Sequence, residues 1–70
     1  MLRIGKYQHY KGKLYEVIVI ATHSETLEKL VVYQAMYGKK KLWARPFDMF
    51  NERVLIKGKK IKRFEFISKK

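Results

Sequence analysis

Positively charged and aromatic side chains alternate in the segment that runs from Tyr37 to Arg45. The segment contains three consecutive lysines, Lys39–Lys41, and the only tryptophan of the chain, Trp43. Domains that bind single-stranded nucleic acid combine cations that contact the phosphates with flat rings that stack on the bases, at about 1–3 kcal/mol per base. The same residues also fit a solvated turn beside a buried Trp43. We expect that burial, because a core built from 70 residues needs its largest side chain.

A second basic run, KGKKIKR, extends from Lys57 to Arg63. It has the composition of an arm that contacts phosphates. Lysines on an edge hairpin also keep a sheet from pairing with another molecule, and the run fits both roles. The candidate nucleic-acid contacts of the two segments are Lys39, Lys40, Lys41, Arg45, Trp43, Tyr37, Lys57, Lys59, Lys60 and Lys62.

A polar loop, His23–Thr26, contains the residue types of a hydrolase, in which a histidine is the base, a glutamate orients it and a serine attacks. Neighbouring residues of a loop point in different directions, whereas triad members come from separate elements, so we rank catalysis lowest. A loop that bonds its own backbone amides through Ser24 and Thr26 is the simpler interpretation. The loop is also the alternative binding site, for a protein or a small ligand, and the charge of the chain is then incidental. Its candidate contacts are His23, Ser24, Glu25, Thr26 and His9.

The charge of the chain is strongly positive and unevenly distributed. The formal net charge is +11, and the positive charges concentrate in residues 1–13, 36–46 and 54–70, while residues 14–35 are slightly acidic. This distribution is typical of a protein that binds a polyanion, and equally of a basic protein kept soluble by self-repulsion. The chain has no cysteine, and His9 and His23 cannot complete a zinc site of four ligands, so we expect no metal and no cofactor.

The hydrophobic pattern predicts an all-β protein whose strands position these residues. Residues 7–21 form a predicted hairpin around a Lys-Gly-Lys turn, and residues 30–37 and 42–45 form strands on either side of Lys39–Lys41. Pro46 cannot donate to a sheet and suits the start of a helical turn over residues 46–50. Residues 53–56 and 61–67 form the last predicted hairpin. Five to six strands, with turns about every 8–12 residues, indicate a small SH3-like barrel or a strongly bent antiparallel sheet, with an OB-like barrel as the next alternative.

A chain of this length forms one domain, which we place at residues 1–70. No stretch reaches the ~20 apolar residues of a membrane-spanning helix, and residues 1–13 lack the apolar core of a signal peptide. We therefore expect a cytoplasmic protein without membrane contact. Its strand edges allow a monomer or a weak dimer.

Several short motifs occur in order along the chain: HYKG at residues 9–12, HSET at 23–26, LVVY at 30–33, YG at 37–38, LW at 42–43, RP at 45–46 and MF at 49–50. Over roughly residues 4–67, this ordered set resembles a bacterial family of small stand-alone domains known as domain of unknown function sixteen fifty-three. The resemblance implies a compact bacterial cytoplasmic domain, and no established activity, cofactor or partner. Relatives tend to carry acidic or neutral residues where this chain has Lys39–Lys41, so the resemblance implies that the charge is a feature of this member.

Together, these observations predict a small binding module whose first candidate partner is RNA or another single-stranded nucleic acid, held mainly through its phosphates. The exposure of Trp43 separates the alternatives. A Trp43 that faces solvent beside the lysines favours nucleic acid, and a buried Trp43 favours the His23–Thr26 loop. A change of His23 would affect only the alternatives that use this loop.

Overall fold

The computed structural model describes residues 2–69, which form seven strands and one short helix. The predicted all-β class is therefore confirmed. In this part of the chain, no helix has the length and the apolar surface needed to cross a membrane. The elements are, in chain order, β1 (Gly5–His9), β2 (Leu14–Thr22), β3 (Lys29–Ala35), β4 (Leu42–Pro46), α1 (Phe47–Phe50), β5 (Arg53–Ile56), β6 (Lys59–Lys62) and β7 (Phe64–Ser68).

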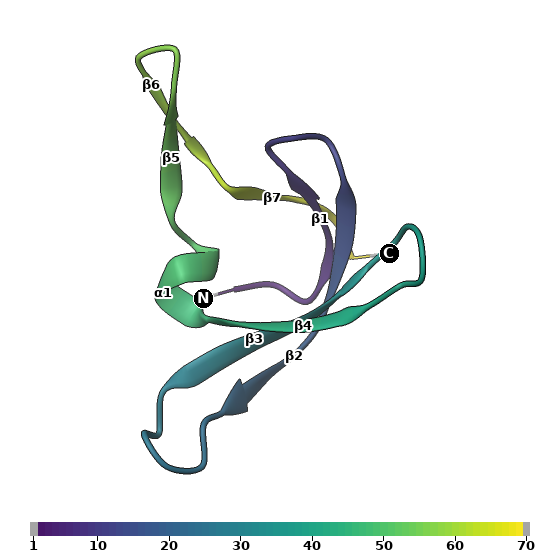
Figure 1. Ribbon diagram of the computed structural model, residues 1–70, viewed down its shortest axis with the longest axis vertical. Coiled ribbons are helices and arrows are strands. Elements are labelled where there is room, and N and C mark those ends of the chain that lie inside the picture. Colours follow the sequence, from purple (N-terminus) through teal and green to yellow (C-terminus); the bar gives the residue numbers. More distant parts are fainter. Residues whose placement is uncertain (1, 70) are drawn as a thin grey trace.

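Five strands form one antiparallel sheet in the order β4–β3–β2–β1–β7, and β5 and β6 form a separate hairpin. Figure 1 shows that the sheet is strongly bent and that the β5–β6 hairpin projects from it. Within residues 2–69, the outer strands β4 and β7 do not pair with each other, so the sheet stays open. Of the predicted alternatives, the bent sheet is the one that forms and a closed barrel is not, because α1 and the β5–β6 hairpin intervene between β4 and β7.

Two irregularities contribute to the bend of the sheet. Ile18 is an extra residue of β2 relative to β3, whose pairing shifts between Val17 and Val19. Such a bulge increases the local twist and bends the strand that carries it. Gly5 in β1 has a φ of 142° and lies so close to the carbonyl of Ser68 that a larger residue would collide with it. Both features help β1 and β2 to curve around the core.

Aromatic rings dominate the core. Phe50 of α1 is 1% exposed and stacks on Phe64 of β7, with the ring centres 4.2 Å apart. Tyr7 and Tyr33 meet Phe50 edge to face at 5.4 and 5.3 Å, a geometry that aromatic pairs prefer. The expected burial of Trp43 is wrong, since its side chain is 47% exposed. The reason is that Phe50 occupies the centre of the core, while Trp43 lies on an outer strand of the sheet.

The last predicted strand, residues 61–67, is divided in two at Arg63. The N–H of Arg63 donates to the carbonyl of Glu52 at 3.0 Å, and its carbonyl accepts the N–H of Tyr10 at 2.9 Å. These bonds tie the chain at the point where β6 ends and β7 begins to pair with β1. The predicted helical turn begins one residue late, at Phe47, because Pro46 keeps an extended ψ of 140° and ends β4.

Candidate functional site

Trp43 and Tyr37 form two walls of a hollow beside the β3–β4 turn. Trp43 pairs with Tyr33 across the two strands, so it lies on the core face of the sheet. The Trp43 side chain is half exposed, and that of Tyr37 is 40% exposed. The hollow has a volume of about 210 Å³, and we name it the Trp43 hollow. It is lined by Ala35, Tyr37, Gly38, Lys39, Lys41 and Trp43.

Backbone hydrogen bonds hold the β3–β4 turn and its lysines in place. The N–H of Lys40 donates to the carbonyl of Tyr37, and the N–H of Ala35 donates to the carbonyl of Lys41, both at 3.0 Å. Gly38 has a left-handed φ of 58°, which glycine adopts without strain. Lys40 has a left-handed φ of 52°, which is uncommon for residues other than glycine. Among the described residues, no carboxylate pairs with any of the three lysines of this turn. Their ammonium groups are therefore available to an anion.

A hydrogen bond between two tyrosines fixes the wall of the Trp43 hollow that Tyr37 supplies. The hydroxyls of Tyr15 and Tyr37 are 2.6 Å apart. Burial of Tyr15 and, to a smaller extent, its bond to Tyr37 raise the pKa of Tyr15 to about 12, so this hydroxyl stays protonated well into the alkaline range. Lys13 adds a cation–π contact, with its Nζ 4.9 Å from the centre of the Tyr37 ring. Tyr37 is thus oriented by the protein itself.

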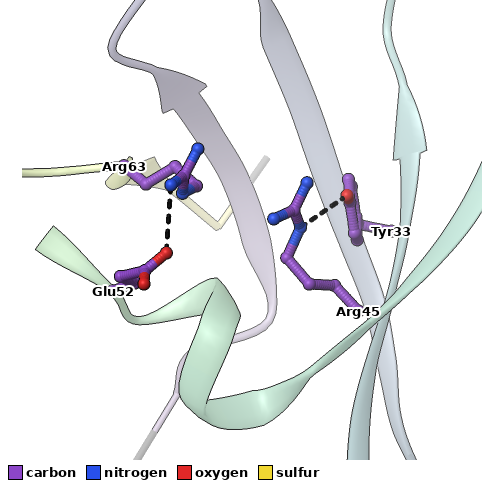
Figure 2. Close-up of polar contacts among 4 residues, drawn as sticks. All are labelled: Tyr33, Arg45, Glu52 and Arg63. Carbon is purple, nitrogen blue, oxygen red and sulfur yellow. Dashed lines mark hydrogen bonds and ion pairs between the residues drawn. The ribbon is translucent and has the colours of Figure 1, made fainter. Parts of the chain in front are cut away.

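Arg45 lies on the core face of β4 and covers the aromatic core. Its Nε donates to the hydroxyl of Tyr33 at 3.3 Å (Figure 2), and its guanidinium carbon lies 5.9 Å from the centre of the Phe64 ring. Figure 2 also shows the ion pair between Arg63 and Glu52, whose atoms are 3.0 Å apart. Arg45 is therefore held by a hydroxyl and a ring, and its side chain has a packing role beside any role in binding.

The second basic run lies away from the first. Figure 1 shows that the β5–β6 hairpin and the β3–β4 turn project from different sides of the molecule. The hairpin turns through Lys57 and Gly58, with left-handed φ angles of 49° and 79° that are typical of a tight two-residue turn. Together with the β1–β2 turn it encloses a larger hollow of about 570 Å³, which we name the His9 hollow. This hollow is lined, among others, by His9, Tyr10, Arg53, Lys60, Lys62 and Glu65.

His9 lies where this hollow meets the aromatic core. Its ring centre is 4.5 Å from that of Tyr10, and its Nδ1 accepts the N–H of Lys11 at 3.1 Å. Burial lowers the pKa of His9, and the positive charges of Arg63, Lys11 and Arg45 lower it further. The imidazole is therefore neutral at neutral pH, and because Nδ1 accepts a hydrogen bond, its proton is on Nε2.

The His23–Thr26 loop uses its polar groups within itself. The Nδ1 atom of His23 accepts the N–H groups of Glu25 and Thr26 at 3.1 and 3.3 Å. The hydroxyl of Thr26 accepts the N–H two residues further along the chain, at 3.2 Å. The loop therefore bonds its own backbone as the sequence indicates, but His23 performs the part that was expected of Ser24.

The five residues predicted as one ligand site are divided between the two ends of β2. His9 ends β1 near Leu14, where β2 begins, while the loop follows Thr22, where β2 ends (Figure 1). A strand advances about 3.3 Å per residue, so most of the length of β2 separates His9 from the loop. The structure thus groups His9 with the lysines of the β5–β6 hairpin instead.

Three side chains of the β1–β2 turn lie in or beside the two hollows and were not among the predicted contacts: Tyr10, Lys11 and Lys13. Tyr10 lines the His9 hollow, and the Nζ of Lys11 lies 5.8 Å from the centre of the Tyr10 ring. Lys13 contacts the ring of Tyr37. The sequence signal was present, because rings and lysines alternate here as they do around Trp43, but Lys-Gly-Lys was interpreted only as a turn.

The comparisons with known proteins agree with the resemblance found in the sequence. A family model described as protein of unknown function (DUF1653) matches residues 5–66. The chain belongs to this family. A crystal structure of a DUF1653 protein from Bordetella bronchiseptica is similar over 94% of this chain and 87% of that chain, with 32% sequence identity and a TM-score of 0.86. No curated protein matches the chain.

Several of the DUF1653 motifs seen in the sequence surround the two hollows. The HYKG motif forms the β1–β2 turn, which borders the His9 hollow. The YG and LW motifs supply Tyr37, Gly38 and Trp43 to the Trp43 hollow. The family description assigns no activity, so the function of this DUF1653 chain has to be argued from the geometry of these hollows.

Proposed function

We propose that this DUF1653 chain binds single-stranded nucleic acid, RNA in the first place, at the Trp43 hollow. The observation that carries the proposal is the exposure of Trp43 and Tyr37 as walls of a hollow that Lys39 and Lys41 also line. A base that stacks on such a ring gains about 1–3 kcal/mol, and ammonium groups beside it contact the phosphates. The rings of this hollow therefore stack on the base of a nucleotide, and its lysines contact the phosphate.

The Tyr37 wall is preorganised for this task. Tyr15 holds the Tyr37 hydroxyl at 2.6 Å, and Lys13 lies over the Tyr37 ring. A side chain that is already ordered loses less conformational entropy when a ligand binds. The lysines also attract the ligand over a distance, since positive charge dominates the surface of the chain at a formal net charge of +11.

A preference for an unpaired base follows from the aromatic walls. Bases in a duplex are already stacked and paired, so one of them reaches a ring only after unstacking, which costs a few kcal/mol. A single strand presents its base faces without that cost. Lysine contacts to phosphate alone would bind a duplex and a single strand alike. A preference for the single strand therefore tests whether the aromatic walls stack on bases.

A salt titration with a short fluorescent single-stranded RNA tests the proposal, with duplex DNA of equal length as the comparison. We expect micromolar or tighter binding to RNA at physiological salt. The logarithm of the affinity should fall with the logarithm of salt concentration at a slope of about −0.7 per phosphate bound. A chain that binds no RNA even at low salt would refute the proposal.

The variant Trp43→Ala tests the position of the site. It should weaken RNA binding about 5- to 150-fold, the range that corresponds to the loss of one stacked base. Leu55→Ala is the matched control, because Leu55 is 68% exposed on the other basic hairpin and is not part of the Trp43 hollow. Equal losses in the two variants would contradict a site at Trp43.

A further inference from the structure

We infer that the His9 hollow is a second contact for the same strand, so that the nucleic acid runs from the Trp43 hollow across the β1–β2 turn to the β5–β6 hairpin. The inference rests on the proposed function and extends it to a footprint of two hollows. Its ligand is a phosphodiester chain with unpaired bases, bound at both ends of the path.

The walls of the His9 hollow repeat the chemistry of the Trp43 hollow. The β5–β6 hairpin contributes Arg53, Lys60 and Lys62, and the described lining includes one carboxylate, that of Glu65. The β1–β2 turn contributes the Tyr10 ring, which lies against the neighbouring histidine ring at an interplanar angle of 31°. As in the Trp43 hollow, the three cations can contact phosphates, and the pair of rings can stack on bases.

The β1–β2 turn connects the two hollows with one cation for each. Lys11 lies over the ring of Tyr10, which lines the His9 hollow, at 5.8 Å. Lys13 lies over the ring of Tyr37, which lines the Trp43 hollow, at 4.9 Å. Two lysines of one turn thus contact rings of both hollows, which places the hollows on either side of this turn. A nucleic-acid strand that crosses this turn passes Lys11 and Lys13 between the two hollows.

The chain contains its own reporters for the two hollows. Trp43 is the only tryptophan, so fluorescence excited at a wavelength that tyrosine does not absorb reports on the Trp43 hollow alone. His9 and His23 are the only histidines and lie at opposite ends of β2. The imidazole resonances of His9 therefore report on the second hollow, and those of His23 serve as an internal control.

A length series of oligonucleotides tests the inference. The full chain is titrated with oligouridines of about 3 to 12 nucleotides, while Trp43 fluorescence and the imidazole resonances are followed. Short oligomers are expected to quench Trp43 and to leave both histidines unchanged. Above a threshold length, the resonances of His9 should shift, those of His23 should not, and the affinity should rise about tenfold or more because the second contact is intramolecular.

Two pairs of substitutions on the same hairpin separate a specific contact from general charge. Lys60→Gln combined with Lys62→Gln should abolish the gain of affinity with length and the His9 shift, and leave the binding of short oligomers unchanged. Lys57→Gln combined with Lys59→Gln removes the same charge from residues that do not line the hollow, and should retain both effects.

Each outcome has a distinct meaning. Equal losses in the two double variants would refute the second contact, because the hairpin would then act only through its charge. Quenching of Trp43 without a His9 shift at any length would refute the second contact and leave the proposed function standing. The absence of binding at every length would refute the proposed function and this inference with it.

Discussion

The two lysine-rich turns of this chain are alike in sequence and differ in their surroundings. Each contains a glycine and a lysine with a left-handed backbone, Gly38 and Lys40 in one, and Gly58 and Lys57 in the other. The β3–β4 turn belongs to the five-stranded sheet, which places Trp43 next to its lysines. The β5–β6 hairpin forms a two-stranded sheet of its own (Figure 1), and all four residues of β6 are exposed.

This difference shows that charge alone does not distinguish a binding surface from a solvated hairpin. Both turns carry lysines that are exposed to solvent. The β3–β4 turn carries Tyr37 itself and leads into Trp43 of β4, whereas residues 53–62 of the β5–β6 hairpin contain no aromatic residue, and other elements supply the rings beside it, such as Tyr10 of the β1–β2 turn. The position of the rings relative to the lysines is therefore the property that our predictions test.

The largest difference between the two regions is expected in stability. Phe50→Ala empties the core on which β3 and β4 rest, and should lower the free energy of unfolding by about 3–5 kcal/mol. Ile61→Ala in the β5–β6 hairpin should cost less than about 1 kcal/mol, because Ile61 is at the surface. Thermal unfolding followed by circular dichroism measures both. Similar losses would mean that the hairpin is packed as tightly as the sheet.

Hydrogen exchange is expected to show the next largest difference. A two-stranded hairpin is only marginally stable by itself, and β5 and β6 pair only with each other in the described sheets. Their amides should exchange through local opening, while those of β2 and β3 exchange only on global unfolding. Exchange followed by NMR tests this, and uniform protection across all strands would contradict it.

The salt dependence of RNA binding should differ between the two turns by a smaller amount. Substitution of Lys39 and Lys41, which line the Trp43 hollow, by alanine should reduce the slope by up to about 1.4, at about 0.7 for each phosphate that the variant no longer binds. Substitution of Lys57 and Lys59 should reduce it less, since neither residue lines a hollow. A greater reduction in the second variant would reverse our ranking of the two turns.

The smallest expected effect concerns the pKa of His9. Burial and the charges of Arg63, Lys11 and Arg45 hold it below 6.5, so Arg63→Gln should raise it, as measured by NMR titration with His23 as the reference. The folded state binds fewer protons than the unfolded state while the pH falls through this range, so protonation of His9 lowers stability below about pH 6.5. A His9 pKa that Arg63→Gln leaves unchanged would contradict the proximity of the two charges.

The elements with local signals were predictable from the sequence. Alternating apolar residues marked the strands, glycines marked three of the turns, and Pro46 marked the end of β4. The division of the last strand at Arg63 was missed because its backbone partners, Glu52 and Tyr10, are 11 and 53 residues away in the sequence. Distant hydrogen bonds of this kind leave no local pattern of residue types.

The sequence by itself determined the all-β class, the two basic turns and the membership of the family. Only the tertiary structure decided which ring is buried: Phe50 takes the place expected for Trp43, because α1 packs against the sheet while β4 lies at its edge. It also decided that the β1–β2 turn brings Lys11 and Lys13 to the rings of two separate hollows. The physical reason is that residue type sets the chemistry of a side chain, whereas its neighbours depend on strand register and sheet curvature, which come from pairing between distant segments.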